Sequence, residues 1–299
     1  MPCPNARSHG RQSAACRTGI PCSAISRSTA RIPVQPDTPV LDVSAVSKAF
    51  PLPSKRLFGR PRRLHAVSGV DLRTGAGATL SLVAETGCGK STLGAIVAGL
   101  AQPDCGQVLV EGVARAQADK AQARELLRKV QLVFQDPVAS LSPRRTVAQI
   151  LAEPLQNFGL CESRKEAQRQ VLELLDKVRL PASAADRLPH EFSGGQRQRV
   201  AIARALASSP RLIVCDEAVS ALDVSVKSQI VNLLLDLQDS EGVALLFISH
   251  DLAIVEQLTD RVAVMYLGRI VEIGSREAVF GNPRHPYTRA LLSAIPVPE

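Results

Sequence analysis

The chain has 299 residues, of which 45% are hydrophobic and 21% charged, and its formal net charge is +8. This is the composition of a globular protein that can bury one large core or two modest ones. Charged residues interrupt every apolar run well short of the roughly 18–20 residues that a bilayer-spanning helix needs, which excludes an integral membrane protein. The cysteines form no Cys-x-x-Cys pair and follow no secretion signal, which favours a reduced, cytosolic chain.

The N-terminal segment is basic and has no hydrophobic period. The first 36 residues hold five arginines and no acidic residue, which accounts for +5 of the net charge. We therefore predict a disordered basic extension over residues 1–38, although its composition also fits a transit peptide or a start codon assigned too far upstream. Five more cations lie in a loop that contains proline and glycine, namely Lys55, Arg56, Arg60, Arg62 and Arg63. Neither segment carries a recognition helix or stacking aromatics, so we predict no nucleic-acid partner.

Hydrophobic periodicity predicts ordered structure from residue 39 onward. It indicates strands over residues 40–46, 66–72, 78–83, 107–110, 130–134, 211–215 and 243–248, and a hairpin over 262–266 and 269–273. It indicates helices over residues 90–100, 121–129, 147–153, 164–178, 224–237 and 252–258, and one more after Gly195. This alternation predicts an α/β fold with a parallel core and a helical insertion at about residues 137–207.

A glycine-rich turn follows the strand that ends at Val83. The sequence from Ala84 to Ser91 resembles the phosphate loop, glycine-x4-glycine-lysine-serine, between a strand and a helix. The resemblance implies a nucleotide site made by Gly87, Cys88, Gly89, Lys90, Ser91 and Thr92, with the Ser91 hydroxyl on Mg²⁺. Ala84 replaces the first glycine of the pattern. This replacement costs about 1–2 kcal/mol if the position needs a positive φ, and little if it needs only a small side chain.

Two adjacent acids end the apolar run over residues 211–215. The stretch resembles the second Walker motif, which implies that Asp216 holds Mg²⁺ and that Glu217 is the general base toward the attacking water. Adjacent acids at this position are also compatible with a simple cap at the end of a strand.

A second anion site is predicted at Ser193. Ser193 is a good N-cap, and the glycines Gly194 and Gly195 let backbone N–H groups approach an anion at the start of a helix. One nucleotide does not need two such sites more than 100 residues apart. The run from Phe192 to Gln196 resembles the signature of ATP-binding-cassette (ABC) ATPases, which caps the nucleotide of a partner subunit.

The resemblance to ABC ATPases covers about residues 40–299 and implies an ATPase domain over residues 39–284. It implies a P-loop NTPase with a RecA-like core, an antiparallel β subdomain and an inserted helical subdomain. It implies ATP and Mg²⁺ as cofactors. It further implies that Gln135 senses Mg²⁺ and water, that His250 contacts the γ-phosphate, and that Phe50 stacks on adenine. Asp223 falls in the loop by which two ATPase subunits touch. Each of these residues also has a purely structural alternative. Gln135 could belong to a turn after an edge strand, His250 could be a structural histidine at the end of a strand, and Phe50 could be a core phenylalanine.

Two further segments resemble one branch of the family. These are residues 139–144 and the tail over 282–299, which contains His285-Pro286-Tyr287-Thr288. Both are similar to the second ATP-binding subunit of bacterial dipeptide, oligopeptide and nickel importers. No cysteine follows Cys215, so we expect no cysteine-bound iron–sulfur cluster of the kind that some relatives carry after this tail.

The resemblance implies a peripheral protein on the cytoplasmic face of the bacterial inner membrane that hydrolyses ATP to energise import of peptides or related solutes. Its expected partners are a second, non-identical ATPase subunit, two transmembrane permease subunits, and a periplasmic or lipid-anchored solute-binding protein. The alternatives are a catalytically weakened regulatory subunit, which only Ala84 favours, and a nickel or glutathione importer ATPase. An ABC protein of translation or DNA repair is disfavoured, because tandem cassettes and long coiled-coil insertions are lacking.

Overall fold

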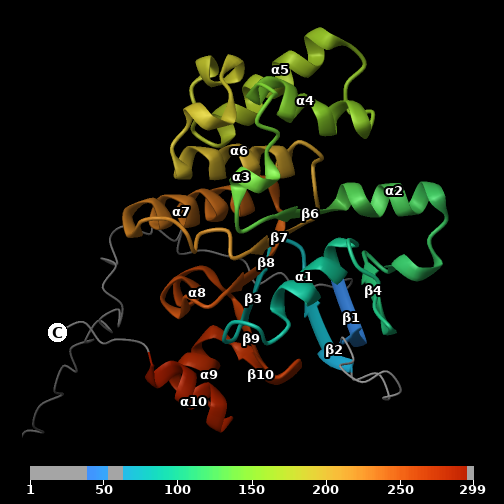
Figure 1. Cartoon of the computed structure of the whole chain (residues 1–299), viewed down its shortest axis with the longest axis vertical. Helices are drawn as coiled ribbons and strands as arrows, with labels where there is room; N and C mark the ends of the chain where they lie inside the picture. The colour runs from blue at the N-terminus through green and yellow to red at the C-terminus, as the bar shows by residue number, and fades with distance from the viewer. Residues whose placement is uncertain (1–38, 53–62, 295–299) are drawn as a thin grey trace, which may run out of the picture.

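The computed structural model of the chain describes residues 39–52 and 63–294. The predicted N-terminal extension and four of the five cations of the second basic cluster lie outside the described residues, as do residues 295–299 of the tail. The described part is elongated, with helices α4 and α5 at one end and α9 and α10 at the other (Figure 1).

A four-stranded antiparallel sheet is built mainly from the first part of the chain. Its strands, in the order β2-β1-β4-β5, are β2 (Arg63–Thr74), β1 (Leu41–Pro51), β4 (Cys105–Val110) and β5 (Val113–Ala114). The predicted strands over 40–46 and 66–72 are confirmed but are longer than expected. Because β1 continues to Pro51, Phe50 is a strand residue that pairs with Leu64 of β2.

The central sheet has six strands in the order β10-β9-β3-β8-β7-β6. They are β10 (Arg269–Ser275), β9 (Arg261–Tyr266), β3 (Thr79–Val83), β8 (Ala244–Ser249), β7 (Leu212–Asp216) and β6 (Val130–Val133). All neighbouring pairs are parallel except β9 with β10, which form the predicted hairpin. The carboxyl ends of β3, β8 and β7 therefore meet at one edge, which is where parallel sheets bind ligands.

The inner strands β3, β7 and β8 of the central sheet are buried on both faces, and their side chains alternate between two apolar clusters. In β8, Leu246 and Ile248 face the cluster that holds the antiparallel sheet and α1, whereas Leu245 and Phe247 face the cluster of the helices that follow β6. This explains why the strands read as continuous apolar runs rather than as alternating patterns. The fold therefore has a helical side and a β side, with the parallel sheet between them (Figure 1).

Four helices outside the insertion pack close to the central sheet or at its edge. They are α1 (Lys90–Ala98), α2 (Lys120–Lys129), α7 (Val224–Glu241) and α8 (Leu252–Leu258). Helix α1 ends at Ala98, because its C-cap Gly99 takes a left-handed φ of 82°, so the predicted helix over 90–100 is two residues too long. Helix α2 begins with a capping box between Asp119 and Gln122. In the described part of the chain, no helix is both long and apolar enough to cross a membrane.

Between β6 and β7 the chain passes through helical structure only. The segment contains α3 (Pro137–Ser140), α4 (Val147–Asn157), α5 (Arg164–Lys177) and α6 (Gly194–Leu206), with the 3-10 helices η3 (Ala182–Asp186) and η4 (Pro189–Glu191). Helix α4 continues through Pro154, where the sequence pattern predicts an end at residue 153. In Figure 1, α6 lies along α7, and α4 and α5 lie beyond it.

The chain after β10 forms helices that the sequence pattern does not predict, α9 (Arg276–Gly281) and α10 (Pro286–Ser293). A serine, Ser275, caps α9, and His285 and Pro286 begin α10.

A short 3-10 helix, η2 (Arg115–Gln117), follows β5.

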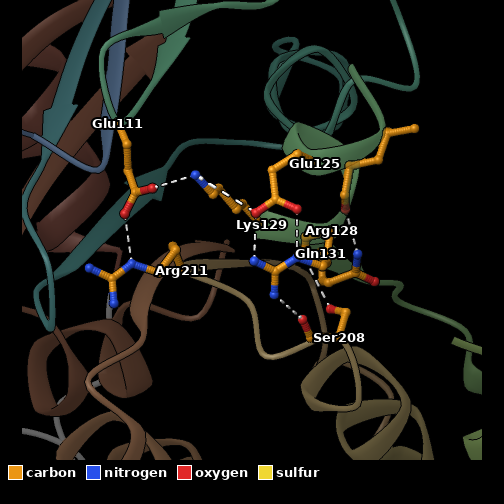
Figure 2. A network of polar contacts seen from close by, with 8 residues as sticks. Glu111, Glu125, Arg128, Lys129, Gln131, Ser208 and Arg211 are labelled. Atoms are coloured by element: carbon orange, nitrogen blue, oxygen red, sulfur yellow. Dashed lines mark hydrogen bonds and ion pairs between the residues drawn. The ribbon is translucent and has the colours of Figure 1, made fainter. Parts of the chain in front are cut away.

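A polar network connects the loop after α6 to α2 and to the turn after β4 (Figure 2). The Arg128 guanidinium donates to the Ser208 carbonyl oxygen at 3.0 Å, and the Ser208 hydroxyl donates back to the Arg128 carbonyl oxygen at 3.1 Å. Glu111, in the turn after β4, binds Lys129 at 2.9 Å and Arg211 at 2.7 Å. These contacts join the antiparallel sheet, α2 and the loop between α6 and β7, so the carboxyl end of α6 is anchored at several points.

Candidate functional site

The loop between β3 and α1 requires glycine at two positions. Gly87 and Gly89 have φ values of 84° and 106°, in the left-handed region that favours glycine. A Cβ on Gly89 would lie 2.0 Å from the carbonyl oxygen of Ala66, so no other residue fits there without displacing β2. The loop is therefore held against β2 with its backbone free to face a ligand.

Lys90, the first residue of α1, is buried with 4% of its surface exposed. Its ammonium donates to the carbonyl oxygens of Ala84 and Glu85, both at 2.8 Å. A buried charge needs such partners to offset its lost hydration. The contacts keep a positive charge within the glycine-rich loop, at the amino end of α1, and both features attract anions.

Ala84 is buried, with 1% of its surface exposed, and is absent from the six described non-glycine residues that have positive φ. Position 84 therefore does not need a positive φ, and its burial requires only that the side chain be small. The backbone therefore imposes no left-handed penalty on Ala84.

The two acids at the end of β7, Asp216 within the strand and Glu217 directly after it, have different surroundings. The Ser91 hydroxyl donates to a carboxylate oxygen of Asp216 at 3.1 Å, which brings two of the three predicted Mg²⁺ ligands together; the third is Gln135. Burial raises the pKa of Asp216, and the charge of neighbouring Glu217 raises it further, against the opposing effects of Ser91 and Lys90. This accumulation of negative charge favours binding of a cation.

Glu217 has a left-handed φ of 48°, an uncommon value for a residue with a side chain. Its N–H donates to the Ile248 carbonyl oxygen at 2.9 Å, which fixes this backbone turn against β8. The Nδ1 atom of His250 lies 3.3 Å from a Glu217 carboxylate oxygen. Strained backbone of this kind is concentrated at functional sites.

Most of the predicted site residues line one cleft of about 460 Å³. Its lining includes these predicted residues: Phe50, Gly87, Cys88, Gly89, Lys90, Ser91, Thr92, Gln135 and Glu217. They come from four segments that are far apart in the sequence. Asp216 and His250 do not line the cleft, but each contacts a residue that does.

The cleft also has a wall that the sequence pattern did not reveal. The rest of the lining is Leu64, His65 and Ala66 of β2, Leu267 and Gly268 of the β9–β10 turn, and Thr86 of the glycine-rich loop. The antiparallel register places His65 opposite Ala49 and Leu64 opposite Phe50. Once Phe50 is assigned to the site, a correct pairing of β1 with β2 would have found these residues.

The residues predicted as the signature lie in a second cluster and do not line the cleft. Ser193 caps α6, and its hydroxyl accepts from the Gln196 N–H while the Gln196 side chain accepts from the Ser193 N–H. Cβ positions built on Gly194 and Gly195 would contact Leu222 and Val226, next to Asp223 at the start of α7. The predicted cap is confirmed, and the start of α6 packs beside the predicted subunit-contact loop.

The residues that could hold Mg²⁺ are few and carry oxygen ligands. Ser91 and Asp216 supply hard oxygen atoms, the type that Mg²⁺ prefers, and Gln135 offers an amide oxygen from the cleft wall. Within residues 39–52 and 63–294, no group of three or more His, Cys, Asp or Glu residues could hold a metal by itself. The set fits an ion that keeps several waters and shares substrate phosphate oxygens, as Mg²⁺ commonly does.

Two family models match the chain. Residues 67–220 match the model described as "ABC transporter", and residues 271–299 match "Oligopeptide/dipeptide transporter, C-terminal region". Among curated proteins, the chain is 52% identical to a probable peptide ABC transporter ATP-binding protein, y4tS, of Sinorhizobium fredii, over 87% of this chain and 73% of that protein.

The chain is also 52% identical to the glutathione import ATP-binding protein GsiA of Escherichia coli K12, over 87% of this chain but only 42% of that longer relative. Among solved structures, it is similar to the ATP-binding cassette MJ0796 in a dimeric post-hydrolysis state bound to ADP and Pi. That similarity has a TM-score of 0.70 and 27% identity, and covers 79% of this chain and 98% of the other.

These similarities confirm the predicted fold class, the ABC ATPase cassette, which is a P-loop NTPase with an antiparallel β subdomain. Members of this family bind ATP, dimerise and work within membrane transporter complexes. The chain belongs to the ABC transporter family, as an ATP-binding protein of its oligopeptide/dipeptide branch.

Proposed function

We propose that this chain hydrolyses ATP in the cleft described above and thereby energises import of peptides or related small solutes such as glutathione. The observation that carries the proposal is the meeting of Phe50, Lys90, Gln135 and Glu217, from four distant segments, on one cleft of about 460 Å³. Such a cleft is within the usual size range of small-molecule and cofactor sites.

The phosphates of ATP would lie on the glycine-rich loop. The N–H groups from Gly87 to Ser91 and the amino end of α1 would receive the phosphate oxygens, and Thr92 would add a hydroxyl contact. Lys90 would exchange its loop carbonyl partners for β- and γ-phosphate oxygens. Phe50, which lines the cleft and is 40% exposed, would stack on adenine.

Ser91, Asp216 and Gln135 would hold Mg²⁺. When bound, the ion would neutralise charge that develops on the transferred phosphoryl group. Glu217 would accept a proton from the attacking water as general base, and His250 would position this carboxylate and contact the γ-phosphate. Ala84 was the only feature that favoured a weakened regulatory subunit, and its ordinary backbone conformation removes that support.

The site would be completed by a partner cassette. Ser193, Gly194, Gly195 and Gln196 lie outside this chain's own cleft, so we assign them to the ATP of the partner subunit, with Asp223 at the contact between subunits. Hydrolysis then depends on closure of the two cassettes, which places the reacting groups and the attacking water together and excludes bulk solvent. The resemblance to importer subunits favours a non-identical partner.

An apolar groove of about 350 Å³ offers a place for the permease subunits. It lies between the end of α1, β6 and α4, and its lining includes Leu100, Leu127 and Phe134, which are 61%, 43% and 41% exposed. Phe134 directly precedes Gln135, so neighbouring residues line the groove and the nucleotide cleft. A short helix of a permease subunit on the inner membrane would reach the nucleotide site through this pair.

The catalytic assignment is tested by Glu217→Gln in the purified transporter complex. We expect turnover to fall at least about 100-fold, the usual contribution of a general base, while ATP binding is retained. Glu241→Gln, a similar change at an exposed acid paired with Lys177, is the matched control and should keep full turnover. Full turnover in Glu217→Gln would show that another group is the base.

The solute is tested by uptake into proteoliposomes that contain the complex and its solute-binding protein. We expect ATP-dependent uptake of a labelled dipeptide or of glutathione, and loss of this uptake in Glu217→Gln. Uptake of nickel without uptake of either peptide would contradict the proposed solute class.

A further inference from the structure

The C-terminal helix touches the phosphate loop through one side chain. The N–H of Glu85 donates to the phenolic oxygen of Tyr287 at 3.3 Å. Tyr287 belongs to α10, within the segment that matches the C-terminal region of oligopeptide/dipeptide transporters. The branch-specific tail therefore reaches the nucleotide site itself.

Tyr287 is supported by a contact to its ring and by contacts at the start of its helix. It packs on the ring of Tyr266, at the end of β9, with 4.3 Å between ring centroids and an angle of 36° between the ring planes. The start of α10 is fixed by the Glu272 carboxylate, which accepts from the N–H groups of Arg284 at 2.8 Å and His285 at 3.0 Å. The phenol is thus presented to the loop by a rigid support.

The peptide group that Tyr287 contacts is also the one that positions Lys90. The carbonyl oxygen of Ala84 accepts from the Lys90 ammonium at 2.8 Å, and the N–H of Glu85, on the same peptide bond, donates to Tyr287. Since the peptide unit is planar, its N–H and its C=O turn together. A hydrogen bond on one side therefore restricts the orientation of the acceptor on the other side.

We propose that Tyr287 is a positioning residue of the nucleotide site, which fixes the peptide between Ala84 and Glu85 and so orients Lys90 toward the phosphates. This inference rests on the proposed role of Lys90 in ATP binding. A second contact supports the loop from the β9–β10 turn, next to Tyr266, because the Gly268 N–H donates to the Cys88 carbonyl oxygen at 3.1 Å. The tail contributes to ATP affinity rather than only to packing.

The test compares Tyr287→Phe with Tyr266→Phe in the full chain. Each variant loses one hydroxyl and keeps the stacked ring, but only Tyr287 contacts the loop through its hydroxyl. We expect ATP, measured by calorimetry, to bind about three- to tenfold more weakly to Tyr287→Phe and within twofold of wild type to Tyr266→Phe. In the complex, the KM for ATP should rise in Tyr287→Phe while kcat stays within twofold.

Hydrogen exchange of the Glu85 amide, measured without nucleotide, reports the contact directly. It should accelerate in Tyr287→Phe and not in Tyr266→Phe, at an unchanged melting temperature. Equal exchange and equal affinity in the two variants would overturn the proposal. Lys90→Ala distinguishes a failure of the role proposed for Tyr287 from a failure of the proposed ATP site. If it abolishes ATP binding while Tyr287→Phe has no effect, only the role of Tyr287 is wrong. If it leaves ATP binding intact, the proposed function is wrong.

Discussion

The two signature glycines should respond in opposite ways to the same substitution. A Cβ on Gly195 would lie 2.5 Å from Val226 Cγ1, about 0.9 Å inside the 3.4 Å at which ordinary contacts begin. Val226 is on α7 and is β-branched, so its side chain has one strongly preferred rotamer there. A Cβ on Gly194 would meet Leu222 Cδ2 at 3.5 Å, which is an ordinary contact.

The magnitudes follow from these two distances. Overpacking costs about 1–3 kcal/mol, and replacing glycine with alanine in a helix returns at most about 1 kcal/mol. We expect Gly195→Ala to lower the free energy of unfolding by about 1–2 kcal/mol and Gly194→Ala to raise it by up to about 1 kcal/mol. Thermal and urea unfolding of the purified chain would measure both changes.

A second substitution tests the assigned contact. Val226→Ala removes the group that the new Cβ would meet, so Gly195→Ala should cost less in that background, with a coupling energy of about 1 kcal/mol or more. The reasoning is refuted if Gly194→Ala and Gly195→Ala change stability equally, or if Val226→Ala leaves the cost of Gly195→Ala unchanged.

Three other predictions concern the loop, the tail and the thiols. Ala84→Gly should leave ATP affinity within twofold and lower the free energy of unfolding by about 1–2 kcal/mol. The loss of stability is expected because the change removes a buried methyl group and increases the conformational entropy of the unfolded chain. A severalfold gain in ATP affinity, measured by calorimetry, would refute this prediction. Burial raises the pKa of Glu272, but the N–H groups that begin α10 outweigh this effect and hold that pKa below its ordinary value. Glu272 therefore stabilises the fold above its unfolded pKa near 4.5, and this stabilisation is lost as the pH falls through the lower folded pKa. Glu272→Gln should lower the free energy of unfolding by about 1 kcal/mol at pH 7 and by less at pH 3. Urea titrations at the two pH values would measure this difference. Burial raises the pKa of Cys215 to about 12, so maleimide at pH 8 should label exposed Cys105 in the native chain and Cys215 only after unfolding, as peptide mass spectrometry would record.

The sequence was most informative where one local signal determines the structure. Continuous apolar runs predicted the inner strands of the parallel sheet, because those strands are buried on both faces. The glycines at 87 and 89 and the serine at 193 predicted a loop and a helix cap that depend only on nearby backbone. Since carboxyl ends of parallel strands meet at one edge, the sequence alone could place the acids at 216 and 217 near this loop.

Features that depend on distant partners were not predictable in this way. The wall formed by Leu64 and His65 depends on the register between β1 and β2, which slips at several points. Helix α10 is short and begins at Pro286, and its fixed position depends on Glu272, 13 residues before His285. The network around Arg128 and Ser208 joins groups 80 residues apart. The conformation of Ala84, likewise, could only be stated as two alternatives.

Ser193→Asp in the assembled transporter tests whether a partner subunit completes the catalytic site. Aspartate caps a helix as well as serine does, so the fold should be kept, but its charge would oppose a phosphate at the start of α6. Because Ser193 lies outside this chain's own cleft, we expect the isolated variant to bind ATP as tightly as wild type. The assembled transporter should lose at least half of its ATPase turnover, and the neutral Ser193→Asn should lose less. Wild-type turnover in the assembled Ser193→Asp complex, or loss of ATP binding by the isolated variant, would contradict the account.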